Sequence, residues 1–256
     1  MAETKGQDMA GKVALITGAA TGFGEAFARS LAADGAAVVI ADIDQAGGER
    51  LADELIGLGQ SAAAIRCDVA DEESAQAAIA RTADRFGAID ILINNAGLHS
   101  AAYNKSFGDL GSVETRRLFD VNLFGILHCT LAARPFMAAR GGGAIVNLAS
   151  IAAFSVTNAY GVSKLAVRGL TIALAHELAA DHIRVNAIAP GLIATDTIRR
   201  ELPQTLFDDF AGRLQLIHRT GELPDVVAAM RYLVSDAASF VTGETLRISG
   251  GYPLAI

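Results

Sequence analysis

The stretch NAYGVSKLAV (158–167) places Tyr160 four residues before Lys164. Free tyrosine and lysine ionise at about pH 10 and about pH 10.4, so neither transfers protons readily at neutral pH. Residues four apart share one face of a helix, and a nearby cation favours the phenolate. Lys164 is therefore expected to lower the pKa of Tyr160 toward the range of a general base. The alternative is an ordinary pair on a helix surface.

A glycine-rich loop follows the first apolar run, in TGAATGFGEAFA (17–28). We expect Gly18 to permit a tight turn, Gly22 to let the backbone approach a pyrophosphate, and Gly24 to let the following helix pack on the strand. The helix N-terminus would add free N–H groups and a positive dipole end. Glycine also serves ordinary turns, so the interpretation depends on the strand before the loop and the helix after it.

Two acidic residues end apolar runs beyond this loop. Asp42 lies 18 residues after Gly24, where a carboxylate can bind both ribose hydroxyls of an adenosine. It would repel a 2′-phosphate, Ile43 is neutral, and the loop lacks Arg and Lys, so NAD is predicted over NADP. Asp68, with Val69, is expected to border the adenine. The alternatives are a solvated carboxylate for Asp42 and a helix cap for Asp68.

Seven short, nearly continuously apolar runs recur along the chain, with Ala/Leu-rich stretches of helical periodicity between them. Such runs are typical of strands buried on both faces of a parallel sheet, and the stretches fit crossover helices. The alternation predicts the α/β class, a single-domain Rossmann fold over 1–256 with a doubly wound parallel seven-stranded sheet flanked by helices. The predicted strands are 12–17, 36–42, 62–68, 89–95, 144–150, 183–190 and 244–249.

Three segments depart from this alternation. Residues from 1 to about 10 are expected to form a flexible N-terminal tail. The irregular stretches 98–113 and 192–222 both follow strand C-termini, where such sheets bind ligands. We expect 192–222 to hold the loop and helices that bind the substrate.

Composition narrows the classes of function. The 256 residues are 52% hydrophobic with a net charge of -7, which argues against a nucleic-acid or anionic membrane surface. The first residues lack the apolar region of a signal peptide, and no uncharged apolar run reaches membrane-spanning length. Cys67 and Cys129 lack metal or disulfide spacing and are interpreted as reduced, buried thiols. A cytoplasmic protein without a metal site is therefore expected.

Several motifs follow one another in a characteristic order. They are TGAATGFG (17–24), Asp42, DV (68–69), NNAG (94–97), VNLFG (121–125), Ser150, YGVSK (160–164), PGLIATDT (190–197) and FVTGETLRISGG (240–251). In this order they clearly resemble the short-chain dehydrogenase/reductase family. The resemblance is to its subgroup of about 250 residues, which oxidises or reduces alcohols and carbonyls, and it covers residues 10 to 252.

The resemblance implies four catalytic residues. Tyr160 would be the general acid/base, Lys164 the cation that lowers its pKa and holds the nicotinamide ribose, and Ser150 the donor that orients the substrate oxygen. Asn122 would hold a water that links Lys164 to solvent. The alternatives are a turn serine for Ser150 and a helix kink or cap for Asn122. Ser150 precedes Tyr160 by ten residues, against about thirteen in the family, and Ser155 is a less suitable competitor within the short loop.

The resemblance also implies cofactor and substrate contacts. The Ile193 backbone would bind the nicotinamide carboxamide, Thr195 the same group or the pyrophosphate, and Asn94 would brace the central strands and line the adenosine side. His99 is a candidate substrate contact beside Ser150 and Tyr160. The predicted cofactor-binding residues are Gly18, Thr21, Gly22, Phe23, Gly24, Asp42, Ile43, Asp68, Val69, Asn94, Ala96, Gly97, Tyr160, Lys164, Pro190, Gly191, Ile193 and Thr195.

These residues predict an NAD(H)-dependent oxidoreductase that interconverts a secondary alcohol and its ketone. The substrate loops carry few charges besides Arg199, Arg200 and Arg213, which favours a neutral, partly apolar small-molecule substrate. One alternative is a 3-oxoacyl-thioester reductase, although such enzymes usually use NADP. Another is a dinucleotide-sensing regulator without turnover. By analogy with the family we expect a homotetramer formed through helices near 115–139 and 158–180 and the last strand.

Overall fold

The computed structural model describes residues 9–254, apart from the side chains of residues 100, 101 and 197. Within this range seven strands form one parallel sheet, in the order β3-β2-β1-β4-β5-β6-β7, which confirms the predicted fold class. The strands are β1 (Val13–Thr17), β2 (Ala37–Asp42), β3 (Ala62–Arg66), β4 (Ile91–Asn94), β5 (Gly143–Leu148), β6 (Ile183–Pro190) and β7 (Thr245–Ile248).

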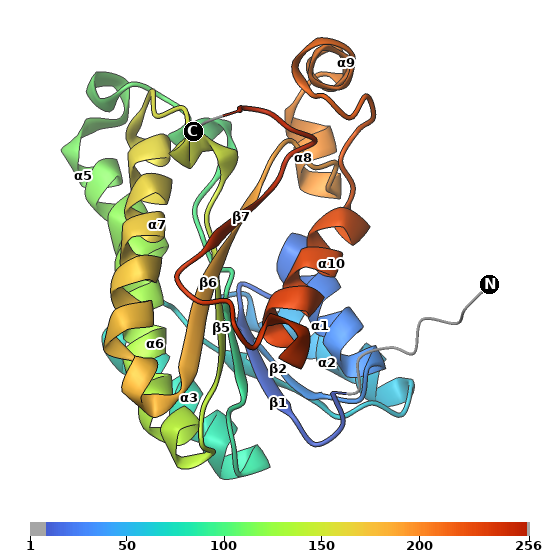
Figure 1. Ribbon diagram of the computed structural model, residues 1–256, viewed down its shortest axis with the longest axis vertical. Helices are drawn as coiled ribbons and strands as arrows, with labels where there is room; N and C mark the ends of the chain where they lie inside the picture. Colours follow the sequence, from blue (N-terminus) through green and yellow to red (C-terminus); the bar gives the residue numbers. More distant parts are fainter. Residues whose placement is uncertain (1–8, 255–256) are drawn as a thin grey trace.

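Helices cover both faces of the sheet, and the view in Figure 1 shows α3, α6 and α7 on one side with α1 and α10 on the other. The longer helices are α1 (Gly22–Ala33), α2 (Gln45–Gly57), α3 (Glu72–Phe86), α5 (Phe107–Phe119), α6 (Gly125–Ala139), α7 (Ala159–Glu177) and α10 (Leu223–Val234). The shorter ones are α4 (Ser100–Tyr103), α8 (Asp196–Glu201), α9 (Gln204–Asp209), the π-helical turns η1 (Asp120–Phe124) and η4 (Phe210–Leu214), and the 3-10 turns η2 (Ile151–Ala153), η3 (Ala179–Asp181) and η5 (Asp236–Ala238).

The continuous apolar runs have a direct structural reason. Successive side chains of a strand point to opposite faces of the sheet. Ile16 and Ile40 pack into the core shared with α1, α2 and α10, whereas their neighbours Leu15 and Val39 pack into the core shared with α3, α6 and α7. Every position of β1 and β4 is therefore buried, and both faces of these strands need residues that pack in a core.

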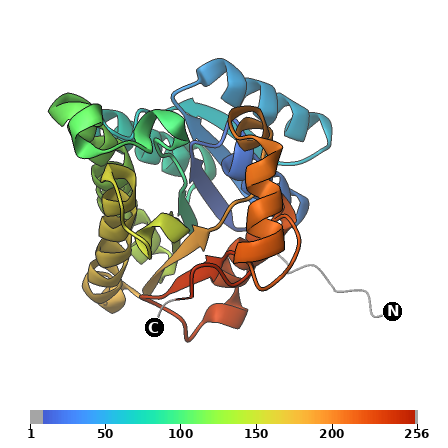
Figure 2. The same ribbon diagram turned by 90° about the horizontal axis from the view of Figure 1, so that it is seen from above.

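The strand order reverses between β1 and β4, so their loops leave in opposite directions at the carboxyl edge of the sheet. Such a reversal opens a crevice in which α/β sheets bind ligands. The two irregular segments of the sequence stand beside it. Seen in Figures 1 and 2, α5 lies on one side of this end of the molecule and α8 and α9 lie on the other.

The expected N-terminal tail falls mostly outside the described residues, because residues 1–8 are not described. Met9, which the tail was expected to include, is 4% exposed and packs in the core beside α1. Its N–H donates to the Asp34 carbonyl at 3.0 Å. Met9 is therefore part of the packed core and not of a flexible tail.

The stretch Phe107–Ala139 is formed by α5, η1 and α6 and has a kink at Gly111, where φ is 74°. Its length and composition alone would fit a membrane span. However, α6 buries Ile126, Cys129, Ala133 and Met137 and packs on α3, as a core helix does. The expectation of no membrane partner stays a prediction.

Gly24 shows how closely α1 approaches the loop that precedes it. A Cβ on Gly24 would lie 2.6 Å from Asn95 Nδ2 and 2.7 Å from Ala19 Cα, and would also meet the Gly18 carbonyl oxygen. We therefore expect Gly24→Ala to lower the unfolding free energy by about 1–3 kcal/mol, measured by urea unfolding.

Gly57 at the end of α2 provides the matched control, because a Cβ there has no neighbour within 4 Å. Gly57→Ala should leave stability unchanged or raise it by up to about 1 kcal/mol. Equal effects of the two substitutions would contradict the close approach of α1.

Candidate active site

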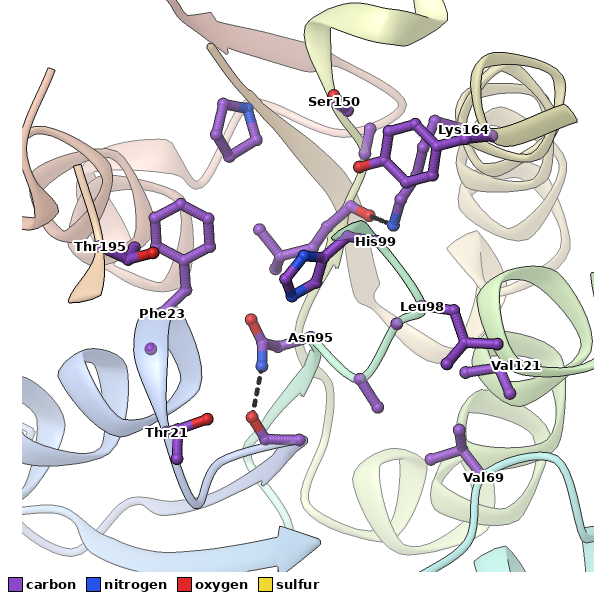
Figure 3. A pocket seen from close by; sticks show the side chains of 18 of the residues that line it. Thr21, Phe23, Val69, Asn95, Leu98, His99, Val121, Ser150, Lys164 and Thr195 are labelled. Atoms are coloured by element: carbon purple, nitrogen blue, oxygen red, sulfur yellow. Dashed lines mark hydrogen bonds between the residues drawn. The ribbon is translucent and has the colours of Figure 1, made fainter. Parts of the chain in front are cut away.

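A cleft of about 530 Å³ opens at the carboxyl edge of the sheet. Figure 3 shows Thr21, Phe23 and Thr195 on one side, Ser150 and Lys164 on the other, and His99 between them. The sequence-predicted residues that line it are Gly18, Thr21, Gly22, Phe23, Asp42, Ile43, Asp68, Val69, Ala96, Gly97, His99, Ser150, Tyr160, Lys164, Pro190, Gly191, Ile193 and Thr195. The predicted residues Gly24, Asn94 and Asn122 are not among the lining residues.

The glycine loop is held by a hydrogen-bond network between β1 and β4. The Thr17 hydroxyl accepts the N–H groups of Asn95 and Ala96 at 3.1 Å each. The Asn95 amide donates to the carbonyls of Thr17 and Gly18 at 3.0 and 2.7 Å, as Figure 3 shows in part. Gly18 has a φ of 61°, and a Cβ on it would lie 2.7 Å from Ala96 Cα. This network fixes the turn at the crevice.

Asn94 corrects a prediction. Its amide donates to Asn147 Oδ1 at 2.9 Å and to Thr130 Oγ1 at 3.2 Å, inside the sheet and toward α6. Asn94 therefore braces the central strands as expected, but it is buried and does not line the cleft. Its neighbour Asn95 does line it. Asn94 and Asn95 are adjacent in the sequence, and the alternation of side chains along the strand decides that Asn95 faces the cleft.

Asp42 is fixed at the end of β2. Its Oδ2 accepts the Ala20 N–H at 2.8 Å and its Oδ1 accepts the Asp44 N–H at 2.9 Å. The carboxylate therefore lines the cleft beside the glycine loop. A negatively charged acceptor next to backbone that carries no Cβ at Gly18 or Gly22 fits a dinucleotide, with the ribose at the carboxylate and the phosphates at the loop.

The helix-cap alternative for Asp68 is wrong, because α3 has another cap. Asp71 Oδ1 accepts the N–H groups of Glu73 and Ser74 at 3.0 and 3.4 Å. Asp68 instead accepts the Ala70 N–H at 3.1 Å and lines the cleft. The sequence correctly indicates a helix cap, but the capping residue is Asp71, three residues after Asp68.

Asn122 lies in the π-helical turn η1 and is 1% exposed. Its Oδ1 accepts the Leu98 N–H at 2.7 Å, and its amide donates to the Leu98 carbonyl and the Ser163 hydroxyl at 3.1 Å each. Both amide hydrogens are used, and the side chain holds the loop after β4 against α7. Its carbonyl oxygens still have acceptor capacity, so the expected contact with a relay water stays a prediction.

Ser150 lies two residues beyond the end of β5 and caps η2, with its Oγ accepting the Ala152 N–H at 3.2 Å. Helix α7 begins beyond it at Ala159, capped by Asn158. Despite the short spacing, Ser150 lines the same cleft as Tyr160, and its hydroxyl acts to lower the pKa of Tyr160. Ser155 is exposed and does not line the cleft. The structure therefore brings Ser150 and not Ser155 to the tyrosine.

The pKa values at the site correct a second prediction. Burial raises the pKa of Tyr160, and the hydrogen bond from Ser150 only partly opposes this. Lys164 Nζ lies 5.9 Å from the centre of the Tyr160 ring and donates to the Leu148 carbonyl at 2.7 Å. Burial lowers the pKa of Lys164 to about 8. The expected lowering of the tyrosine pKa by lysine is absent here, because the ammonium is turned toward Leu148.

The loop after β6 forms the wall opposite Ser150. Ile193 pairs with Gly221, which joins both ends of the segment that carries α8 and α9. The Thr195 hydroxyl caps α8 by accepting the Ile198 N–H at 3.2 Å. Thr195 lines the cleft. Its predicted contact with the nicotinamide carboxamide or the pyrophosphate stays a prediction.

The described residues contain no cluster of three His, Cys, Asp or Glu side chains that could hold a metal ion. The absence of a metal cofactor stays a prediction. Cys67 and Cys129 are free and buried, and Cys67 forms part of the cleft wall. Partial burial and the charge of Lys164 lower the pKa of His99.

A doubly wound parallel sheet with a glycine loop at its crevice and Ser150, Tyr160 and Lys164 beside it defines a nicotinamide-dinucleotide oxidoreductase. The family model described as enoyl-(acyl carrier protein) reductase matches residues 18–253. A cis-4-hydroxycyclohexanecarboxylate dehydrogenase of Sinomonas cyclohexanicum is 40% identical over 250 residues, covering 96% of this chain and 98% of that protein. The chain belongs to the short-chain dehydrogenase/reductase family, whose members here are oxidoreductases acting on CH–OH donors.

Other relatives agree with this assignment. A 7alpha-hydroxysteroid dehydrogenase of Escherichia coli (strain K12) is 36% identical over 244 residues and 94% of each chain. A solved 7 alpha-hydroxysteroid dehydrogenase, complexed with NADH and 7-oxo glycochenodeoxycholic acid, has a TM-score of 0.90 at 35% identity over 98% of each chain. The relatives share this fold along its whole length.

The lowered pKa of Lys164 predicts a stability cost. An unfolded lysine titrates at about pH 10.4, so the folded protein, with Lys164 at about 8, binds fewer protons between these values. Unfolding free energy should therefore rise with pH from about 8 to about 10. We expect Lys164→Met to be more stable than the wild type by about 1–3 kcal/mol at pH 7, and the difference to shrink over this pH range.

Urea unfolding at a series of pH values measures this difference. Lys12→Met is the control, because the Lys12 side chain is 51% exposed. A Lys164→Met variant that is less stable than the wild type at every pH would contradict the prediction.

Proposed function

We propose that this protein is an NAD(H)-dependent oxidoreductase that interconverts a secondary alcohol and its ketone, with Tyr160 as general acid/base. The observation that carries the proposal is that Ser150, Tyr160 and Lys164 line one cleft together with the glycine loop, and Figure 3 shows Ser150 and Lys164 across it from Thr21 and Phe23. Because Tyr160 and Ser150 line the same cleft, both hydroxyl groups can meet one substrate oxygen.

The three side chains divide the work. Ser150 donates to the substrate oxygen and stabilises the charge that develops there. The Tyr160 hydroxyl oxygen accepts the alcohol proton in oxidation and returns it in reduction. The Lys164 ammonium lies near both the Leu148 carbonyl and the Tyr160 ring. When the ammonium turns from the carbonyl toward the Tyr160 oxygen, its charge favours the phenolate. When bound, the nicotinamide cofactor supplies the hydride acceptor and, in its oxidised form, a further positive charge.

Asp42 supports the choice of NAD over NADP. Its carboxylate lies at the ribose end of the cleft and is held there by two backbone N–H groups. A 2′-phosphate at this position would face a fixed negative charge. Ile43 beside it offers no positive charge in compensation.

The substrate end of the cleft supports an alicyclic secondary alcohol. Leu98, Leu192 and Ile198 supply apolar walls, and His99 is the nearby polar side chain. The named relatives act on a hydroxycyclohexane acid and a hydroxysteroid, both alcohols on saturated rings. A panel of cyclic alcohols, linear alcohols and 3-oxoacyl thioesters, followed by reduced-nicotinamide absorbance, tests this class. Preference for acyl thioesters with NADPH would overturn it.

Tyr160→Phe removes the acid/base hydroxyl and keeps the ring. We expect kcat to fall at least about 100-fold, while NADH binding, measured by fluorescence, persists. Tyr103→Phe is a matched control, because Tyr103 donates its hydroxyl to Glu114 at 2.9 Å and lies outside the cleft wall. Comparable activity of the two variants would refute the role of Tyr160.

Asp42→Asn removes the charge and keeps an acceptor for the loop. We expect the ratio of kcat/KM with NADP to that with NAD to rise at least about tenfold, which corresponds to about 1.4 kcal/mol. Asp44→Asn makes the same charge change at the cap of α2, outside the cleft wall. The ratio should not change in this control, and an unchanged ratio in Asp42→Asn would reject the NAD assignment.

A further inference from the structure

The short segment between Ser150 and α7 contains Phe154, whose aromatic ring fixes the position of the segment. After Ser150 the chain turns through η2, in which the Ala153 N–H donates to the Ser150 carbonyl at 3.0 Å. The Phe154 N–H donates to the Ile151 carbonyl at 2.9 Å. Phe154 is therefore bound rigidly to the turn that Ser150 caps, and whatever fixes its ring also fixes Ser150.

Two guanidinium groups lie over this ring. Arg168 Cζ is 3.9 Å and Arg247 Cζ is 4.8 Å from the centre of the Phe154 ring. Arg168 also donates to the Ala153 carbonyl at 3.3 Å. Cation–π contacts of this kind strengthen where water is excluded, and here they connect η2 to two different elements of the fold.

Arg168 joins η2 to the catalytic helix. Tyr160, Lys164 and Arg168 follow one another at intervals of four residues in α7, so they share one face of the helix. The contact of Arg168 with Phe154 therefore sets the position of η2 along the same face that presents Tyr160. Gly161 allows this closeness, because a Cβ there would lie 3.0 Å from the Ala152 carbonyl oxygen.

Arg247 joins η2 to the sheet. It lies in β7, whose neighbour is β6, and it donates to the Pro253 carbonyl at 2.8 Å. Helix α7 and strand β7 thus hold the same ring from separate parts of the chain. The hydrogen bonds within the short segment are in this way supplemented by contacts with two other elements.

We propose that Phe154, with Arg168 and Arg247 over its ring, is a positioning residue that keeps the Ser150 hydroxyl beside Tyr160 in the cleft. The proposal rests on the function proposed above. Loss of the ring frees η2, moves the Ser150 hydroxyl away from Tyr160, and leaves the burial of the phenol unopposed. Tyr160 then accepts a proton less readily at neutral pH, and the pH profile of turnover moves upward.

Other ionisable groups around Tyr160 stay in place when Phe154 changes. Lys164 on α7 and His99 from the loop after β4 line the same cleft. On α5, Glu114 accepts the Tyr103 hydroxyl at 2.9 Å. Arg168 and Arg247 keep their charges in every variant of Phe154. A shift of the pH profile in these variants therefore reports the Ser150 contact.

The experiment compares Phe154→Leu, which keeps apolar volume, with Phe154→Tyr, which keeps the ring. We expect Phe154→Leu to lower kcat about tenfold, since a displacement of about 1 Å can cost up to 100-fold. The pKa seen in the kcat/KM profile, and in ultraviolet titration of the phenol with Tyr160→Phe as the blank, should rise by about half a unit. Phe154→Tyr should keep kcat and this pKa at their wild-type values. Neither variant should change the affinity for NADH.

Phe86→Leu is the matched control, because Arg85 lies 5.5 Å from the centre of the Phe86 ring at the end of α3. It should change neither kcat nor the pH profile. If Phe154→Leu does not fold, Phe154→Met takes its place with the same expected shift. A wild-type profile in the folded variant overturns the positioning role, as does an equal effect in Phe86→Leu.

Tyr160→Phe and Ser150→Ala in the same assay separate the two proposals. If they lose turnover while Phe154→Leu keeps the wild-type profile, the positioning role alone is overturned. If Tyr160→Phe stays fully active, the proposed function is overturned, and the positioning role with it.

Discussion

The hydrogen bond from Lys164 to the Leu148 carbonyl, 2.7 Å long, links α7 to the end of β5, two residues before Ser150. Because Lys164 is buried, its ammonium has little water to replace this acceptor, and burial lowers its pKa to about 8. The bond therefore connects α7 to β5, and it holds the positive charge of Lys164 in a buried environment that disfavours the charged form. The positions of Tyr160 and Ser150 depend on it.

The dinucleotide half of the cleft depends on a comparable link between β1 and β4. Thr17 and Asn95 exchange hydrogen bonds across the point where the strand order reverses. Because this network is completed by backbone groups, it holds the glycine loop without any contact from a ligand. These hydrogen bonds, all within the protein, fix the backbone on both sides of the crevice.

Much of this could be predicted from the sequence, because it depends on local signals. Continuous apolar runs located the strands, and the motifs located Asp42, Ser150 and Tyr160 at strand and helix ends. What could not be predicted depends on contacts between distant segments. The sequence does not reveal which of Asn94 and Asn95 faces the cleft, or that Lys164 turns to Leu148. The sequence also does not reveal that the Asn122 side chain is hydrogen-bonded to the backbone of Leu98.

Asp42 serves the fold as well as the ligand, since Ala20 and Asp44 both donate their N–H groups to it. If Asp42 sets the proposed preference for NAD, a substitution that admits a phosphorylated cofactor also disturbs at least one of these loop contacts. The charge that would select the cofactor and the hydrogen bonds that shape the loop are therefore properties of one side chain.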